Sequence, residues 1–513
     1  MAADYAPEHV LALIGSSSVL DGIYFPLKEA APGGLRNVSA ARIISSQWPM
    51  AFALGFAVLQ PSVHAQGTKQ PSPEVQARIL TDADKAALTR ALAAYDQGRA
   101  QESESVLRDL VRRFPSNFEA TETLGLIYAE GGDLSSALPL LEKACILRPS
   151  SALAQGNLGA AYLKLNRVQD ALRVLRRSAT LDPKSPETQS ALGQALLLAG
   201  RPRDAATAFA AAASEGLRSP DLLYNWGLAL FNAGDAKHAV EVLARFPEKE
   251  SSAQVQSLLG DVEEKQGHYA PALVHFQTAA KLDPSEPNVH ALGLELIRHW
   301  TFPAAIKIYE YGVSKYPESA RMQLGLGIAL YGNDDYAASA PVFSRLVEKD
   351  PENILYADLL GRSCLLLAEK ENSGCDTLEE VAGQHPQNTT AAMRVAEDIL
   401  RRPKEQQDLD RARHLLEQAI AADPKSAGAY FQMGVLEQQQ EHWQESATML
   451  EKAVAFRPEY AQAHYRLARA YAHIGKREQA EQQIALQQKY SQLDEENLSA
   501  RTKEATTFLV TLH

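Results

Sequence analysis

The chain has 513 residues and a formal net charge of −12. Proteins that bind nucleic acids usually carry an excess of basic residues that neutralise phosphates, and this acidic chain does not, so no nucleic-acid partner is expected. Hydrophobic residues make up 45% and aromatic residues only 7%, which favours helices packed through small side chains over a β-sandwich. Three cysteines are too few for a disulfide-dense scaffold, and their spacing fits no zinc site.

Residues 1–65 have the features of an export leader. Arg36 and Arg42 precede an apolar run, Met50 to Leu59, and small residues occupy the −3 and −1 positions before a cleavage point after Ala65. This order predicts a signal peptide and a periplasmic or secreted protein. The run is about ten residues, too short to span a bilayer, so no integral membrane span is expected in the mature chain.

Residues 1–35 are longer than an export signal needs. One interpretation is that translation starts downstream of Met1. The alternative is a disordered tail followed by a small hydrophobic anchor helix, and a cytoplasmic regulator would follow if the signal were inert.

A glycine recurs at intervals of 33 or 34 residues along most of the chain. A second small residue follows it twelve positions later, and a proline closes many of the units. Because the glycine and the second small residue recur with the same spacing, the sequence indicates an internal repeat. The glycines are Gly125, Gly159, Gly193, Gly227, Gly260, Gly293, Gly327 and Gly361.

Each unit has the pattern of two amphipathic helices joined by a short turn. Gly or Asn often occupies the turn, as at Gly132 and Asn166, because these residues tolerate the left-handed conformation that ends a helix. The small residues allow the two helices to approach closely, and a Leu or Phe four positions after the second one fills the space beside the contact. Stacked neighbours must supply the core.

The pattern resembles the tetratricopeptide repeat, best in the second unit with Leu124-Gly125, Tyr128, Gly132, Ala137 and Pro149. The resemblance implies an all-α, right-handed superhelical solenoid of about twelve helical hairpins over residues 84–494. Residues 66–83 are interpreted as a linker, and residues 495–513 as a C-terminal capping helix or tail. The units are predicted to begin near residues 84, 118, 152, 186, 220, 253, 286, 320, 354, 389, 427 and 461.

Three units depart from the pattern. The fifth lacks the usual tail after Phe246-Pro247, and the ninth and tenth carry longer loops around residues 370–374 and 401–406. The sequence contains no phosphate-binding glycine loop, no His-Glu-x-x-His and no Gly-x-Ser-x-Gly. The residues outside the repeats are too few for a catalytic domain. We therefore predict a protein that is not an enzyme and that needs no cofactor or metal.

Two of the three cysteines fall in the ninth unit. Cys364 takes a buried place in the first helix, and Cys375 lies near the small-residue position of the facing helix. A disulfide between them is geometrically plausible in an oxidising compartment. The simpler interpretation is two buried thiols that act as small hydrophobic side chains.

The resemblance also implies a concave groove, lined in this family by the second, fifth, ninth, twelfth and thirteenth residues of each unit. Glu119, Glu122 and Glu130 make an acidic mouth. The residues predicted to contact a protein or peptide partner are Leu197, Leu198, Tyr224, Leu228, Phe231, His290, Leu294, Arg298, Arg321, Leu324, Tyr331, Arg362, Arg394 and Arg401.

Apolar side chains on a groove usually mark an interaction site, and arginines beside them can pair with carboxylates. The groove is therefore predicted to bind a peptide with apolar anchors and acidic groups. The alternative is that Leu197, Leu228 and Leu324 belong to inter-repeat packing and that the assigned repeat register is wrong by one residue. Two roles remain open: an exported scaffold that supports assembly of an envelope or secreted complex, or an auxiliary subunit of a glycan-processing or other biosynthetic system whose catalysis resides in a partner chain.

Overall fold

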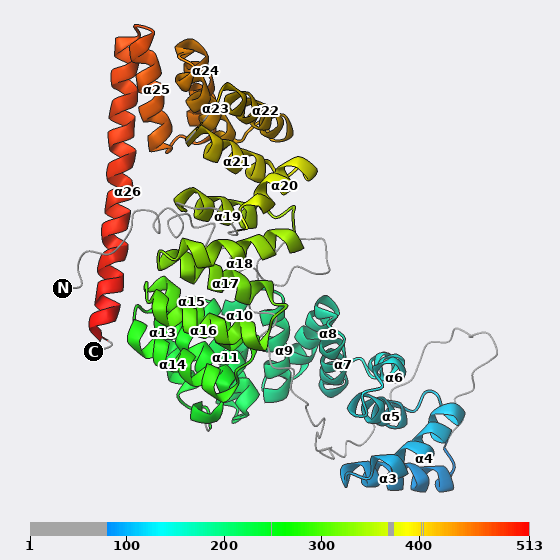
Figure 1. Ribbon diagram of the computed structural model, residues 1–513. Helices are drawn as coiled ribbons and strands as arrows, with labels where there is room; N and C mark the ends of the chain where they lie inside the picture. Colours follow the sequence, from blue (N-terminus) through cyan, green and yellow to red (C-terminus); the bar gives the residue numbers. More distant parts are fainter. Residues whose placement is uncertain (1–79, 248, 368–373, 402, 404, 512–513) are drawn as a thin grey trace, which may run out of the picture. The chain divides into compact units, whose positions relative to one another are not determined.

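The computed structural model describes residues 80–511, except 248, 368–373, 402 and 404, and describes side chains up to residue 500 (Figure 1). Within these residues the chain is all-α, with twenty-four α-helices in twelve successive hairpins and no strand. None of the described helices is both long and apolar enough to cross a membrane. The predicted export signal, most of the predicted linker and the core of the ninth unit's long loop lie outside the described residues.

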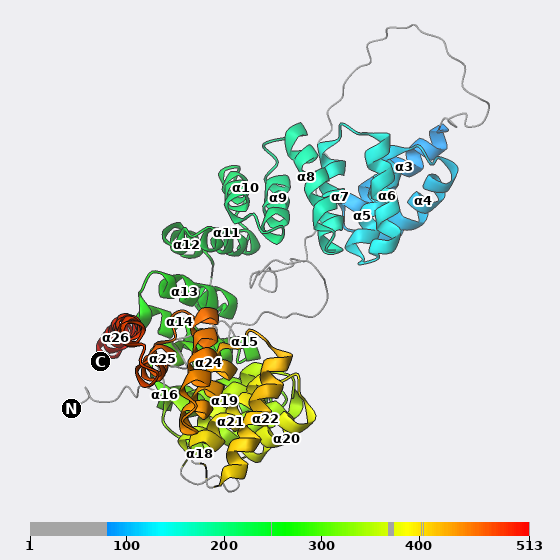
Figure 2. The same cartoon turned by 90° about the horizontal axis from the view of Figure 1, so that it is seen from above.

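The chain forms two compact units that divide between Lys249 and Glu250, and each is described by itself. In the unit of residues 80–249, consecutive hairpins lie side by side (Figure 2). Its five hairpins are α3 (Asp82–Asp96) with α4 (Ala100–Arg113), α5 (Phe118–Glu130) with α6 (Leu134–Leu147), α7 (Ala152–Lys164) with α8 (Val168–Leu181), α9 (Pro186–Leu198) with α10 (Pro202–Ser214), and α11 (Pro220–Asn232) with α12 (Ala236–Leu243).

The unit of residues 250–511 contains seven hairpins, preceded by a short 3₁₀ turn, η2 (Lys249–Ser251). They are α13 (Ala253–Lys265) with α14 (Tyr269–Leu282), α15 (Glu286–Arg298) with α16 (Phe302–Lys315), α17 (Ala320–Gly332) with α18 (Tyr336–Lys349), α19 (Ile354–Leu366) with α20 (Asp376–Gln384), α21 (Thr389–Arg401) with α22 (Gln406–Ala422), α23 (Ala427–Gln439) with α24 (Trp443–Phe456), and α25 (Ala461–His473) with α26 (Arg477–Thr511).

The first helix of each hairpin begins at the predicted residue, except that α3 begins at Asp82. In eight of these helices the start is set by a polar cap residue that precedes the first turn. Its side-chain oxygen accepts a hydrogen bond from a backbone N–H of the first turn, which otherwise has no partner within the helix. These caps are Asn117, Ser151, Ser185, Ser219, Ser252, Ser319, Asn353 and Ser426.

The recurring glycine packs against one large side chain sixteen residues later. In seven units a Cβ atom at the glycine would lie only 2.4–2.7 Å from that side chain, and at Gly125 it would lie 3.0 Å from Leu141, so a larger residue would collide with the second helix. The predicted close approach of the two helices is therefore confirmed. The pairs are Gly159 with Leu175, Gly193 with Phe209, Gly227 with Leu243, Gly260 with Phe276, Gly293 with Tyr309, Gly327 with Phe343, and Gly434 with Leu450.

The ninth hairpin is built differently. α20 has only nine residues, and α19 packs mainly against α18 and α21 rather than against α20. Gly361 accordingly faces Arg394 of the next hairpin. Cys364 and Cys375 form a disulfide that joins α19 to the start of α20. The structure thus has the bonded pair, whereas Cys145 is a buried free thiol.

The last hairpin has no boundary at residue 495, where the tail was expected to begin. α26 runs without a break from Arg477 to Thr511. The second helix of the twelfth hairpin and the predicted capping helix are therefore one element, which also contacts α14 within the same unit.

Candidate functional site

Half of the residues predicted to contact a partner are buried. The first helices that carry these residues, α9, α11, α15 and α17, are each covered by their own second helix and by helices of neighbouring hairpins, so little of their surface remains exposed. Because the helices begin where predicted, this burial needs no shift in register, and it favours the packing interpretation for these side chains. They are Leu197, Tyr224, Leu228, His290, Leu294, Leu324 and Tyr331.

The other predicted residues keep some exposure and fall into two sets. Leu198 and Phe231 are half-buried on α9 and α11 of the unit of residues 80–249. The second set is made of arginines on α15, α17, α19 and α21 of the unit of residues 250–511. Arg298, Arg321, Arg362 and Arg394 are partly exposed and Arg401 is exposed.

Most of these arginines already have partners within the protein. Arg362 and Arg394 both donate to the Asp358 carboxylate, Arg362 Nε to Oδ2 at 2.7 Å and Arg394 Nε to Oδ1 at 2.9 Å. Burial opposes the charge of Asp358, but the two guanidinium groups lower its pKa. Arg321 differs, because it has no ion pair or hydrogen bond with any residue of the described part of the chain.

Side chains at the end of one first helix reach the end of the preceding first helix. Lys164 Nζ donates to the Ala129 carbonyl at 3.2 Å, and Gln439 Nε2 donates to the Leu400 carbonyl at 2.7 Å. Arg401 donates likewise to the Leu365 carbonyl. Carbonyls in the last turn of a helix have no partner within that helix, so these groove side chains cap the previous repeat.

The predicted acidic mouth is also paired internally. Arg148 donates to Glu119 at 2.6 Å, and the Tyr95 hydroxyl donates to Glu130 at 2.6 Å. Glu122 is 5% exposed and accepts one hydrogen bond, from Asn157 Nδ2 at 3.2 Å. Burial raises the pKa of Glu122 to about 7.

The Glu122→Gln variant should therefore respond to pH in a defined way. A carboxyl with a raised pKa in the folded state destabilises the fold as pH rises from the unfolded value, about 4.3, through 7. We expect the free energy of unfolding of wild type to fall by about 2 kcal/mol between about pH 5 and 7 through this group, and the variant to lack that loss. Urea unfolding at several pH values measures it. Glu119→Gln is the matched control and should keep the wild-type slope; an unchanged slope in Glu122→Gln would contradict the prediction.

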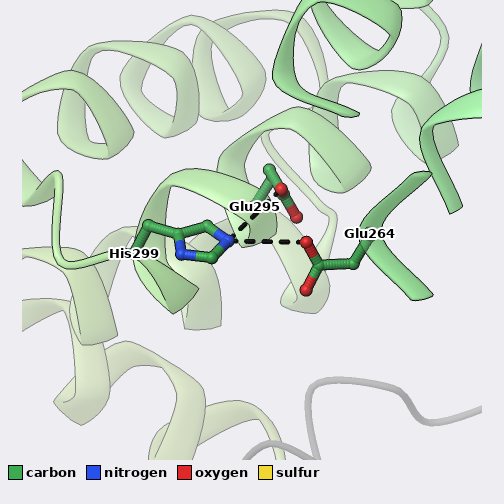
Figure 3. Close-up of side chains that lie close together, drawn as sticks. All are labelled: Glu264, Glu295 and His299. Carbon is green, nitrogen blue, oxygen red and sulfur yellow. Dashed lines mark hydrogen bonds and ion pairs between the residues drawn. The ribbon is translucent and has the colours of Figure 1, made fainter. Parts of the chain in front are cut away.

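A second cluster, not predicted from the sequence, joins α13 to α15 (Figure 3). Glu264 lies in the last turn of α13, Glu295 in the last turn of α15, and His299 directly after α15. His299 Nε2 lies 3.5 Å from Glu264 Oε2 and 3.4 Å from Glu295 Oε1. The side chains of Glu295 and His299 are fully buried and that of Glu264 is 19% exposed.

Charge in this cluster is balanced by Arg298. Its Nη1 atom lies 3.6 Å from Glu264 Oε1 and 3.6 Å from Glu295 Oε2, the two oxygens that do not face His299. Burial alone would lower the pKa of His299, but the two carboxylates raise it to about 9. Burial raises the pKa of Glu295. Burial also opposes ionisation of Glu264, but His299 and Arg298 lower its pKa.

Sequence reasoning missed this cluster because its members come from two repeats. One sequence feature indicated it: Glu295 lies in the last turn of α15 and His299, four residues later, is its C-cap residue, and a spacing of four places side chains on the same side of a helix. The third member, Glu264, becomes visible only when the repeats are aligned, since it lies in the corresponding turn of the preceding first helix.

Two family profiles, both of the tetratricopeptide repeat, match the chain. One matches residues 88–152, 190–253 and 290–354, and the other matches residues 128–195 and 437–503. Together they span more than half of the chain. No curated protein sequence matches it significantly.

Solved structures also resemble the chain. Naa15/Naa10 bound to HypK-THB is 15% identical, with 79% of this chain and 68% of that chain covered and a TM-score of 0.32. YrrB, a TPR protein with an unusual peptide-binding site, is 19% identical, with coverages of 38% and 97% and a TM-score of 0.32. PilF of Pseudomonas aeruginosa is 17% identical, with coverages of 40% and 95% and a TM-score of 0.35.

Proposed function

Because this chain belongs to the tetratricopeptide-repeat family, we propose that it is a non-catalytic scaffold that binds a segment of a partner protein on the first helices of its hairpins. The proposal rests mainly on the exposure of Arg321 and on its lack of an internal ion pair within the described part of the chain. Arg321 is the second residue of α17, partly exposed, and without an ion pair among the described residues. The other four arginines predicted to contact a partner, Arg298, Arg362, Arg394 and Arg401, bind carboxylates or carbonyls of the protein itself.

A guanidinium group without an internal partner suits a carboxylate of the bound segment. Apolar contacts would come from Leu355, the second residue of α19, and Leu365, both half-buried. The expected ligand is therefore an acidic segment with aliphatic or aromatic anchors, which retains the chemistry predicted from the sequence and places it in the unit of residues 250–511.

The test compares capture by the purified full-length chain and by an Arg321→Glu variant, using extracts of the cell envelope and of the cytoplasm. We expect the reversed charge to weaken capture of the specific partner about tenfold or more. Lys307→Glu is the matched control, because Lys307 is exposed on the second helix α16 and the change in charge is the same. Equal capture by wild type and Arg321→Glu would remove the proposal. A captured enzyme with glycan-processing activity would favour the auxiliary-subunit role instead.

We further propose that the protein is exported and works in the periplasm or outside the cell. The Cys364–Cys375 disulfide supports this, because such bonds persist in oxidising compartments and are rare in the cytosol. N-terminal sequencing of the mature protein tests it. We expect a start at Gln66, and a start well upstream would contradict export by the predicted signal.

A further inference from the structure

We propose that Glu264, Glu295 and His299 form a binding site for a divalent transition-metal ion of the Zn²⁺ class. Each of the three residues offers one ligand atom, and these atoms lie within 4.8 Å of one another. The carboxylate oxygens that face His299 Nε2 are Glu264 Oε2 and Glu295 Oε1. The ion would link the ends of α13 and α15, the first helices of two consecutive hairpins (Figure 3).

The spacing of these atoms fits a metal better than it fits hydrogen bonds. The separations of 3.4 and 3.5 Å between His299 Nε2 and the two carboxylate oxygens exceed the length of a strong charged N–H···O bond. Atoms bound at about 2.0–2.1 Å in a tetrahedron around Zn²⁺ lie about 3.3 Å apart. An ion between the three atoms would therefore need only small adjustments.

The surroundings of Glu295 give an independent reason to expect a metal ion at this cluster. The Glu295 carboxylate is fully buried, yet neither oxygen has hydrogen-bond geometry with any described residue. Its ion pairs with His299 and Arg298, at 3.4 and 3.6 Å, lack that geometry, and a buried ion pair repays its lost hydration only when hydrogen bonds of good geometry accompany it. Arg298 Nη1 approaches the oxygens that face away from His299. One oxygen of each glutamate is thus left directed toward His299.

The backbone adds to the attraction for a cation. Glu264 lies in the last turn of α13 and His299 is the C-cap residue of α15, so two helix C-termini with their partial negative charge meet at the cluster. One imidazole with two carboxylates suits Zn²⁺, Co²⁺ or Mn²⁺. It does not suit Ca²⁺ or Mg²⁺, which take several oxygen ligands. The partial exposure of Glu264 leaves an approach for the ion and for a water as fourth ligand.

The site is tested by titrating the metal-free full-length chain with Zn²⁺ alone and measuring the heat of binding by isothermal calorimetry. We expect one tight equivalent in wild type and its loss in Glu264→Gln and in His299→Asn. The matched control is Glu263→Gln with His268→Asn, because this neighbouring pair, 2.7 Å apart, offers one carboxylate and one exposed imidazole but no buried third ligand. The control should keep the tight equivalent and bind Zn²⁺ with unchanged affinity.

Co²⁺ provides a readout that does not depend on whether a variant folds. Wild type loaded with one equivalent should show the visible absorption of a four-coordinate site, and one equivalent of Zn²⁺ should abolish it. Zn²⁺ should also raise the Tm of wild type and not that of Glu264→Gln. Absence of a tight equivalent in wild type, or its retention in folded Glu264→Gln, overturns the proposal.

Discussion

Replacing Gly325 with alanine is expected to lower the free energy of unfolding of the unit of residues 250–511 by about 3 kcal/mol. The new Cβ atom would lie 2.1 Å from Cε1 of Tyr309, whose ring is fully buried. The ring cannot retreat, because Gly293 on α15 faces its other edge at a Cβ distance of 2.5 Å. Urea denaturation followed by circular dichroism measures the loss, and hydrogen exchange should localise it to α15, α16 and α17.

The control for this prediction is Gly383→Ala. Gly383 lies in α20, is exposed, and has nothing within 4 Å of an added Cβ atom. Alanine there should raise stability by about 0.5–1 kcal/mol through helix propensity. Tyr309→Leu combined with Gly325→Ala should lose less than the sum of the two single changes, since the smaller side chain relieves the collision. Stability of Gly325→Ala equal to wild type would show that the helices can separate without cost.

Removing the disulfide should have an effect of similar size. For a loop closed between residues 11 apart, the chain-entropy relation predicts a loss of about 3 kcal/mol in the Cys364→Ala, Cys375→Ala double variant. The loss should concentrate in α19, α20 and α21, because the bond joins α19 to the start of α20 and α21 packs against both. Hydrogen exchange with and without reductant gives the measurement.

Cys145→Ala separates the effect of the bond from that of a lost thiol. Burial raises the pKa of the Cys145 thiol to about 12, so it stays protonated and unreactive. Reductant should therefore destabilise both wild type and Cys145→Ala and leave the double variant unchanged. A double variant as stable as oxidised wild type would show that the bond contributes nothing to the ninth hairpin.

The hairpins could be predicted from the sequence because each is a local structure. Gly293 and Tyr309 are sixteen residues apart and meet within a single unit, so a repeating pattern reveals their contact. The cap at Ser319 and the helix that starts at Ala320 follow from two adjacent residues. The ninth hairpin could not be foreseen in the same way. Its first helix packs on α21, and no residue pattern within the ninth unit predicts that contact.

The groove was harder to predict because exposure depends on neighbouring repeats. Leu228 takes a groove position in its own unit, but it is only 2% exposed once the adjacent helices cover it. Arg394 was predicted to be free for a partner, and it instead binds Asp358 of the preceding repeat. Glu264 and His299 are 35 residues apart, so their meeting is a property of the stack rather than of either segment.

The disulfide in the ninth hairpin also limits how far unravelling can spread along the unit. In a repeat array each hairpin is held by its neighbours, so fraying that starts at one end travels from hairpin to hairpin. The two helices of the ninth hairpin barely touch each other, but the bond keeps α20 attached to α19 when α21 begins to leave. We therefore expect fraying from α26 to stop at this hairpin under oxidising conditions. When the disulfide is reduced, we expect the fraying to continue toward α18. The redox state of this bond would then decide how many repeats unfold together.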